Sequence, residues 1–367
     1  MNSLTLGSPP SAKPSHRLPN GVAAVAKVLG LFWAIAQALH LFGDPTSPAW
    51  TALTNIKQPL GIAIVGDSRA HAGLSPARLG EAIETPVNIY NFAVDGTDAL
   101  HHTSFVVNGL LNQKVPPAVI LWAPNPLSFN EERKNNRVEQ LTLSDLPLLW
   151  RNRAPFEMLL DITTAELFGP YRQRVVLKRV MKNLTDRMAW LAVHVQRRVL
   201  KLGYTPLLPA REYLHADRGY APFNVLRWQD AFERSAADYA HQYRTARLST
   251  LRTEAARDLL RAARRAGVHV VVLELPVAPW FQENLATQDF HRAWRKWVQE
   301  IAAEEGADFV CDAAFGSDNH EFGDPGHMHR TAAEAYSEKL GVKLRTIPAV
   351  CAALEKAARG SVEGKPN

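Results

Sequence analysis

The stretch Leu60-Gly61-Ile62-Ala63-Ile64-Val65-Gly66-Asp67-Ser68-Arg69-Ala70 decides how the rest of the chain is interpreted. Its apolar, β-branched first half predicts a buried strand, and Gly66 allows a sharp turn where strand gives way to helix. Such a turn holds the Ser68 hydroxyl at the carboxyl end of a strand, where open α/β sheets bind their ligands. The first N–H groups of the helix would point to the same place, ready for an oxyanion. The alternative is that Asp67 and Ser68 only cap the helix.

A second stretch, Gly323-Asp324-Pro325-Gly326-His327-Met328-His329, supplies what a serine nucleophile needs. A serine hydroxyl is a weak nucleophile at neutral pH, so it requires a base within hydrogen-bond reach and a group that orients the base. Asp324 and His327 would lie on one short turn entering a helix, with the carboxylate holding the ring that faces Ser68. His329 is a second candidate base, but in a helix its ring would point in a different direction from that of His327.

Together these residues resemble the SGNH (GDSL-type) hydrolase superfamily, which carries its serine in Gly-Asp-Ser and closes with Asp-x-x-His. The resemblance is strongest to the membrane-anchored cell-envelope branch that includes the alginate O-acetylation and DltD-like proteins. That branch has Ser-Arg-Ala after the first strand and a Tyr/Phe-Ser pair on the helix after its last block, here Tyr336-Ser337. His329 stands where the pattern usually has Asn. The resemblance covers roughly residues 60–130 and 255–345.

The resemblance implies catalytic roles for Ser68, Asp324 and His327, and an oxyanion hole made by Ser68, Gly96 and Asn125. Gly96 follows a second predicted strand over 87–93, and Asn125 follows a third over 117–123. Each has a simpler interpretation, since Gly96 suits an ordinary turn and an Asn between two prolines is a common turn former. The implied chemistry requires no metal ion and no organic cofactor.

The order of these blocks predicts the fold class α/β, a three-layer α/β/α flavodoxin-like SGNH sandwich with a mainly parallel sheet. Helices over 251–266 and 289–304 and strands over 268–275 and 307–312 continue the pattern after a helical insertion at about 130–250. The insertion is basic, which suits a lid, a membrane-surface face, a groove for an anionic glycan, or a solvated face without a ligand. Its basic residues include Arg172, Arg174, Lys178, Arg179, Lys182, Arg187, Arg197, Arg198 and Lys201.

The amino-terminal part predicts attachment to a membrane. Residues 1–20 form a basic leader without acidic residues, and the apolar stretch 21–43 is long enough to span a bilayer as a signal anchor. A buried or surface helix is the alternative for that stretch. Positive charge before the span predicts a cytoplasmic amino terminus and a periplasmic catalytic domain at the inner membrane. A linker over 44–59, an SGNH-like domain over 60–350 and a tail over 351–367 complete the predicted organisation.

Composition excludes several classes of protein. The chain has 367 residues, 46% of them apolar, so most of it should fold. Its formal charge of +6 suits nucleic acid, an anionic membrane or an anionic polymer, but no zinc-finger or RRM-like motif supports nucleic acid. Two cysteines, Cys311 and Cys351, make neither a disulfide framework nor a metal cluster.

The resulting functional expectation is serine-dependent acyl-ester chemistry at the cell envelope. We expect O-acyl transfer to, or removal from, a surface polysaccharide through an acyl-Ser68 intermediate, with an acyl ester or acylated polysaccharide as substrate. In the family pattern the partner is a membrane-bound O-acyltransferase that supplies the acyl group. The alternatives are a plain SGNH esterase or lipase-like hydrolase, and a non-catalytic envelope scaffold or glycan-binding protein.

Overall fold

The computed structural model describes residues 24, 25, 27, 28, 30, 31, 34, 48–132, 141–167, 218–222, 229–312, 315–316 and 318–363. Within this part of the chain no helix is long and apolar enough to cross a membrane. Most of the anchor predicted over 21–43 lies outside the described residues, as do the leader and much of the predicted insertion. The anchor therefore stays a prediction.

A five-stranded, wholly parallel sheet forms the centre of the fold, with strand order β2-β1-β3-β4-β5. The expectation of an α/β protein with a mainly parallel sheet is confirmed, and the strand order is that of flavodoxin-like doubly wound sheets. Each strand predicted from an apolar run is present, shorter by one or more residues at its ends. The strands are β1 (Ile62–Gly66), β2 (Ile89–Asn91), β3 (Val119–Ala123), β4 (His269–Glu274) and β5 (Asp308–Cys311).

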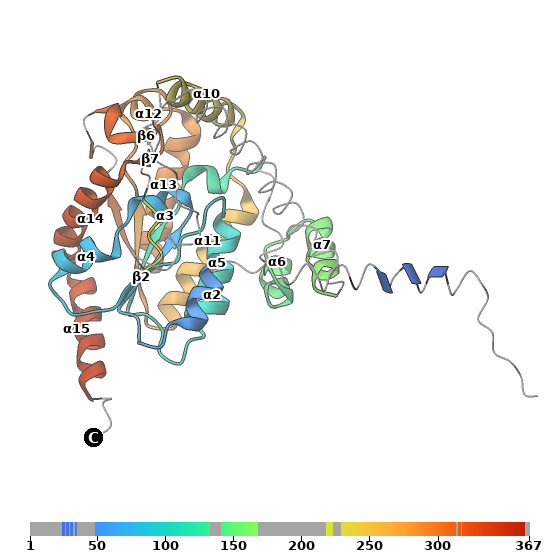
Figure 1. The fold of residues 1–367 in the computed structure, drawn as a ribbon, viewed down its shortest axis with the longest axis horizontal. Helices are drawn as coiled ribbons and strands as arrows, with labels where there is room; N and C mark the ends of the chain where they lie inside the picture. Colours follow the sequence, from blue (N-terminus) through green and yellow to red (C-terminus); the bar gives the residue numbers. More distant parts are fainter. Residues whose placement is uncertain are drawn as a thin grey trace, which may run out of the picture.

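Helices cover both faces of this sheet (Figure 1). Successive strand residues point to opposite faces, so Ile62 and Ile64 pack in one apolar cluster and Ala63 and Val65 in the other. The first face carries α3 (Ser68–Gly73), α4 (Pro76–Ile83), α14 (Arg330–Leu344) and α15 (Pro348–Glu363). The second carries α2 (Pro48–Asn55), α5 (Ala99–Ser104), the π-helical turn η1 (Phe105–Leu110), α11 (Thr250–Arg265) and α13 (Asp289–Glu305).

Helix α15 extends the packed core beyond residue 350, where the sequence suggested that a tail begins. Val350 and Leu354, one helical turn apart, are both buried against the first face of the sheet. A helix that buries an apolar stripe in this way belongs to the domain.

Between β3 and α11, the regular secondary structure of the described residues is helical apart from a single bridge, which joins Asn130 to Leu248. This agrees with the helical character predicted for the insertion. The elements there are η2 (Pro126–Phe129), η4 (Leu143–Asp145), α6 (Leu146–Arg151), α7 (Phe156–Leu167) and α10 (Gln229–Thr245).

Four further short elements complete the described fold, and α12, β6 and β7 lie beside α10 at the top of Figure 1. They are α12 (Pro279–Asn284), η5 (Asn319–Glu321), β6 (Phe322–Asp324) and β7 (His327–Met328), and β6 and β7 pair as a small antiparallel hairpin. This hairpin carries both Asp324 and His327, so the last sequence block returns to the end of the sheet that presents Ser68.

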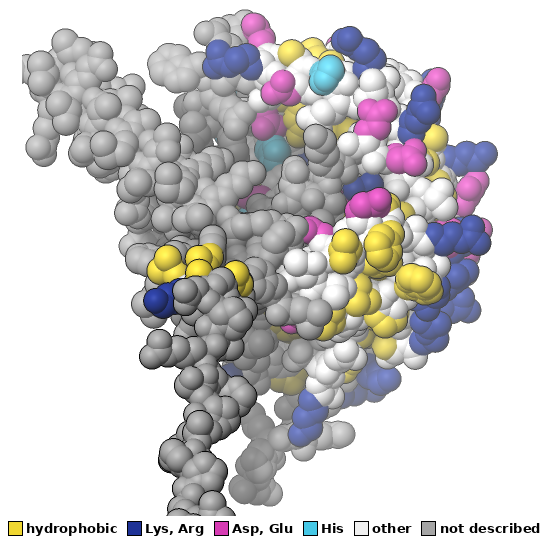
Figure 2. Space-filling view, turned by 90° about the vertical axis from the view of Figure 1, so that its right-hand side faces the viewer, with side chains coloured by type: hydrophobic (Ala, Val, Ile, Leu, Met, Phe, Trp, Pro, Cys, Tyr) yellow, Lys and Arg dark blue, Asp and Glu magenta, His cyan; other side chains and the backbone are white. Residues whose placement is uncertain are grey.

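Charges of both signs are interspersed over the described part of the face shown in Figure 2, with basic side chains most frequent along its lower right edge. Some charged side chains pair between neighbouring elements, as Arg261 of α11 does with Glu305 of α13 at 2.8 Å. Exposed pairs of this kind contribute little to stability.

Candidate active site

The turn between β1 and α3 brings Ser68 to the carboxyl end of the sheet. Gly66 is required there, because a Cβ at this position would lie 2.6 Å from the Cβ of Ala70 and 2.7 Å from the carbonyl oxygen of Ala123. Asp67 is the N-cap of α3, and its carboxylate accepts the backbone N–H two residues further on at 3.0 Å. Asp67 therefore caps the helix, whereas the hydroxyl of Ser68 does not act as a cap and contacts another side chain.

Ser68, His327 and Asp324 form a continuous row of hydrogen bonds. The Oγ atom of Ser68 lies 2.8 Å from Nε2 of His327, and Nδ1 of the same ring lies 2.8 Å from Oδ1 of Asp324. The Asp324 side chain is 8% exposed and that of His327 is 15% exposed, so the carboxylate is the more deeply buried of the two. The fold thus brings Ser68 to two residues that lie more than 250 positions further along the sequence.

The hydrogen bonds around Asp324 decide where the imidazole proton lies. Its Oδ1 atom also accepts the backbone N–H groups of Gly326, at 2.9 Å, and of His327, at 3.1 Å. An ionised carboxylate can only accept hydrogen bonds, so next to an ionised Asp324 the Nδ1 atom of His327 carries the ring proton. The lone pair of Nε2 then faces Ser68 and can accept the hydroxyl proton.

The local structure around His327 differs from the prediction. Asp324 and His327 lie at the turn of the β6–β7 hairpin, and neither belongs to a helix. The argument that helical spacing separates the rings of His327 and His329 is therefore wrong in its premise. His329 instead precedes α14 as its N-cap, and its backbone N–H donates to the carbonyl oxygen of Glu321. The ring that contacts Ser68 is that of His327.

Arg69 joins the two halves of the row, a role that sequence reasoning missed. Its side chain is buried, and its Nε donates to the carbonyl oxygen of Gly326 at 3.1 Å. Its Nη2 donates to the carbonyl oxygens of Leu275, at 2.8 Å, and Pro276, at 3.3 Å. One guanidinium therefore ties the Ser68 helix to the histidine hairpin and to the end of β4. The sequence shows an arginine directly after the serine. Its partners cannot be predicted, because they are backbone carbonyl oxygens, which every residue has.

Gly96 lies in a turn fixed beside the end of β1. The N–H of Val94 donates to the carbonyl oxygen of Gly66 at 3.0 Å, and the N–H of Thr97 closes the turn on the carbonyl oxygen of Val94 at 3.3 Å. Gly96 has φ +74°, a left-handed conformation that favours glycine. Gly96 is exposed, and its turn is attached to Gly66, two residues before Ser68. The turn interpretation is thus correct, and it is compatible with a donor role.

Asn125 follows β3, the strand that pairs with β1. The β1–β3 register pairs Gly66 with Ala123, and two residues further along each chain come Ser68 and Asn125. The Oδ1 atom of Asn125 accepts the N–H of Leu127 at 3.0 Å, which caps η2 as the turn-former interpretation predicts. With the oxygen occupied in this way, the amide NH2 group is the part that can donate to a ligand.

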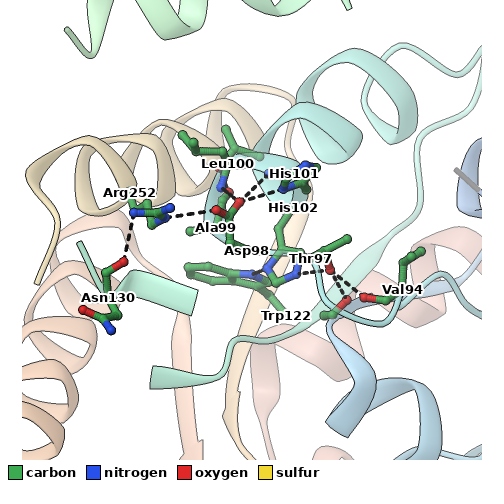
Figure 3. A network of polar contacts seen from close by, with 12 residues as sticks. Val94, Thr97, Asp98, Ala99, Leu100, His101, His102, Trp122, Asn130 and Arg252 are labelled. Carbon is green, nitrogen blue, oxygen red and sulfur yellow. Dashed lines mark hydrogen bonds and ion pairs between the residues drawn. The ribbon is translucent and has the colours of Figure 1, made fainter. Parts of the chain in front are cut away.

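Sequence could not place the remaining histidines, and two of them lie in a buried polar network on α5 (Figure 3). Asp98 accepts Nδ1–H of His101 at 2.7 Å and Nε–H of Arg252 at 3.0 Å. Burial alone would raise the pKa of Asp98, but His101 and Arg252 hold it well below its usual range. His102, on the same helix, contacts Thr97 instead.

The metal-ligating and thiol side chains of the described residues are placed as follows. No group of three or more His, Cys, Asp and Glu side chains in them is arranged to hold a metal ion. Cys311 and Cys351 form no disulfide with each other. The Sγ atom of Cys311 donates to Glu274 at 3.2 Å, and that of Cys351 donates to the carbonyl oxygen of Arg345 at 3.0 Å.

Proteins similar to this chain are found among solved structures and among sequence families. No curated protein matches the chain. Among solved structures, one from Streptococcus pneumonia, described with a provisional assignment as a platelet activating factor, is 10% identical over 88% of this chain and 97% of its own, with a TM-score of 0.36. A likeness at that level carries no argument about fold or function. The sequence profile of DUF1574, described as a protein of unknown function, matches residues 57–339, a range that contains Ser68, Asp324 and His327. The chain therefore belongs to the DUF1574 family.

Proposed function

We propose that this protein is a serine-dependent acyl-ester enzyme of SGNH type, in which Ser68 forms an acyl-enzyme intermediate. The observation that carries the proposal is the hydrogen-bonded row of Ser68, His327 and Asp324, with both distances at 2.8 Å. A serine, a histidine and a carboxylate in this order make a nucleophile, a general base and an orienting group.

In the proposed reaction, Nε2 of His327 takes the proton of Ser68 as Oγ attacks the carbonyl carbon of an ester. Asp324 stabilises the imidazolium that forms, because its Oδ1 accepts Nδ1–H. The tetrahedral intermediate collapses when His327 gives the proton to the departing alkoxide. An acceptor hydroxyl then attacks the acyl-Ser68 ester by the same steps in reverse, and Ser68 is regenerated.

Three donors are proposed for the oxyanion of the tetrahedral intermediate. They are the N–H of Ser68 in the first turn of α3, the N–H of Gly96 in its exposed turn, and the side-chain NH2 of Asn125. The support is their common location at the carboxyl ends of β1, β2 and β3, which are neighbours in the sheet. Donors that are fixed before the reaction stabilise developing charge without reorganisation, and each contributes several kcal/mol in comparable enzymes, on the order of 3.

The molecule that accepts the acyl group distinguishes two versions of this proposal. Water as acceptor makes the protein a plain esterase, whereas a sugar hydroxyl makes it an O-acyltransferase of an envelope polysaccharide. Both use the same residues. The proposal of acyl transfer rests on the resemblance to the envelope branch and on the anchor predicted over 21–43, which would place the domain in the periplasm beside a membrane-bound O-acyltransferase.

Turnover of a nitrophenyl acetate tests the proposal and separates the two acceptors. The full chain should release nitrophenol, and Ser68→Ala and His327→Ala should abolish the release above the rate in buffer. Adding an oligosaccharide should speed release and give an acylated sugar if transfer is the reaction. If a folded full chain releases no nitrophenol with any short or medium acyl ester, the enzymatic proposal fails and the scaffold or glycan-binding alternative takes its place.

A further inference from the structure

Three buried side chains, joined by hydrogen bonds, hold the turn between Val94 and Thr97 that contains Gly96 (Figure 3). Thr97 closes the turn, and its Oγ1 donates to the carbonyl oxygen of Val94 at 2.7 Å. The same Oγ1 lies 3.1 Å from Nε2 of His102, and Nδ1 of His102 accepts the indole N–H of Trp122 at 3.3 Å. Thr97, His102 and Trp122 are each at most 3% exposed. The chain therefore connects the turn after β2 with α5 and with β3 in the core of the sheet.

The direction of every hydrogen bond in this chain follows from the tryptophan. An indole N–H can only donate, so Nδ1 of His102 must accept. The ring of a neutral His102 then carries its proton on Nε2, which donates to Oγ1 of Thr97. The hydroxyl has one proton, and it points to the carbonyl oxygen of Val94, with that of Gly66 as a second acceptor at 3.3 Å. The indole, the imidazole and the hydroxyl each have a single assignment of donor and acceptor atoms, so their hydrogen bonds hold the turn in one arrangement.

A second histidine holds the other side of the same turn. Nδ1 of His71, on α3, lies 2.9 Å from Oδ1 of Asp95, the residue directly before Gly96. His71 follows Ser68 by three residues and lies on the same side of α3. The turn is thus attached both to the helix that presents the nucleophile and, through Thr97, to the core.

We propose that Thr97, His102 and Trp122 are positioning residues that hold the N–H of Gly96 where the oxyanion forms. This inference rests on the proposed function, because the oxyanion exists only if Ser68 attacks a carbonyl. It adds residues that neither the sequence blocks nor the Ser68–His327–Asp324 row includes. None of the three touches the reacting atoms, and each acts through the position of one backbone N–H.

The first test compares three variants of the full chain on a nitrophenyl acetate and on a trifluoromethyl ketone, whose hemiketal with Ser68 mimics the tetrahedral intermediate. Thr97→Val removes the hydroxyl at almost constant volume and should lower kcat about 10- to 100-fold with KM within about twofold, since a misplaced oxyanion donor weakens the transition state alone. The inhibition constant of the ketone should rise by a similar factor. Thr97→Ser should recover most of the loss, and Trp122→Phe should act in the same direction as Thr97→Val.

The control is Thr253→Val, the same change on α11, where the hydroxyl bonds only to helix carbonyl oxygens of Ser249 and Thr250. It should leave kcat, KM and ketone inhibition unchanged. The inference is overturned if Thr97→Val keeps wild-type kcat, or if it loses activity while ketone inhibition stays the same.

A second measurement tests the positioning without any turnover. In the full chain labelled with 15N-glycine, Thr97→Val should shift the Gly96 amide resonance and speed its hydrogen exchange, and Thr97→Ser should restore both. 15N shifts of His102 should show a neutral ring protonated on Nε2. If the wild type is inactive but these signals behave as described, the proposed function fails and the positioning stands. If the Gly96 amide does not respond to Thr97→Val, the positioning is wrong whatever the activity.

Discussion

Replacing Asp324 by Asn should slow the enzyme by about 100-fold, less than the loss expected when the side chain is removed. The reason is that one oxygen of Asp324 accepts the hydrogen bonds that orient His327. The atom Oδ1 accepts the ring Nδ1–H and the two backbone N–H groups of Gly326 and His327. An Asn carbonyl oxygen can accept all three, and the two backbone donors oppose a flip that would turn its NH2 toward the ring. His327 should keep its proton on Nδ1 in this variant.

The magnitude follows from the charge that Asn lacks. With charge centres about 4 Å apart and an effective dielectric constant of about 20, a carboxylate and an imidazolium attract by about 4 kcal/mol. A neutral amide oxygen recovers about 1 kcal/mol through its hydrogen bond. The remaining loss of about 3 kcal/mol in the transition state corresponds to about 10²-fold in kcat. Asp324→Ala also removes the orienting contact and leaves two backbone donors without this acceptor, so kcat should fall about 10³- to 10⁴-fold.

Single-turnover release of nitrophenol by the two variants, next to wild type and Ser68→Ala, measures both losses. The 15N shifts of His327 in Asp324→Asn should still show a proton on Nδ1. Equal losses in the two variants, or a change of the His327 tautomer in Asp324→Asn, would refute the reasoning that the backbone donors fix the oxygen. Thermal unfolding of both variants shows that they are folded.

Three further predictions concern the frame around the row. Gly66→Ala should lower the free energy of unfolding by about 1–3 kcal/mol, because its Cβ would lie 2.7 Å from a backbone carbonyl oxygen that cannot move aside; Gly80→Ala, whose Cβ would make an ordinary contact at 3.7 Å, is the matched control in thermal unfolding. Arg69→Lys should destabilise by about 2–4 kcal/mol and lower kcat, since an ammonium cannot replace the guanidinium fork that reaches three carbonyl oxygens; equal unfolding temperatures would contradict this. Burial raises the pKa of Glu274, but hydrogen bonds from His291 and Arg295 outweigh it and lower that pKa to about 2. The folded pKa is below the unfolded one, so the stabilisation is complete above pH 4.5 and is lost as the pH falls toward 2; Glu274→Gln should flatten urea-unfolding stability over that range, and an unchanged slope would contradict the assignment.

The sequence was sufficient for the sheet and for the central row because both have local signals. Apolar, β-branched runs such as the one before Ser68 form strands that are buried on both faces of the sheet. Such strands can therefore be predicted from the run of residue types itself. Ser68 and His327 could be predicted to lie together because each belongs to a short motif, one with a candidate nucleophile and one with a candidate base. The row's geometry then follows from the parallel sheet, which gathers the ends of its strands at one edge.

Other parts of the site had no readable signal. The partners of Arg69 are backbone carbonyl oxygens more than 200 residues away, and every residue has a carbonyl. The contact of His102 with Trp122 depends on how α5 packs over β3, which no spacing in the sequence encodes. The hairpin around His327 was predicted as a helix entrance because Asp-x-x-His is compatible with both, and only the pairing of β6 with β7 distinguishes them.

The most direct test of the central claim is labelling of the full chain with a fluorophosphonate, followed by mass spectrometry of the labelled peptide. The account predicts a single phosphonylated residue, Ser68, with labelling abolished in Ser68→Ala, strongly slowed in His327→Ala, and unchanged in Ser144→Ala, which alters an exposed serine of η4. Labelling of another serine, or labelling of Ser68 at the same rate with and without the His327 ring, would contradict the claim that His327 activates Ser68.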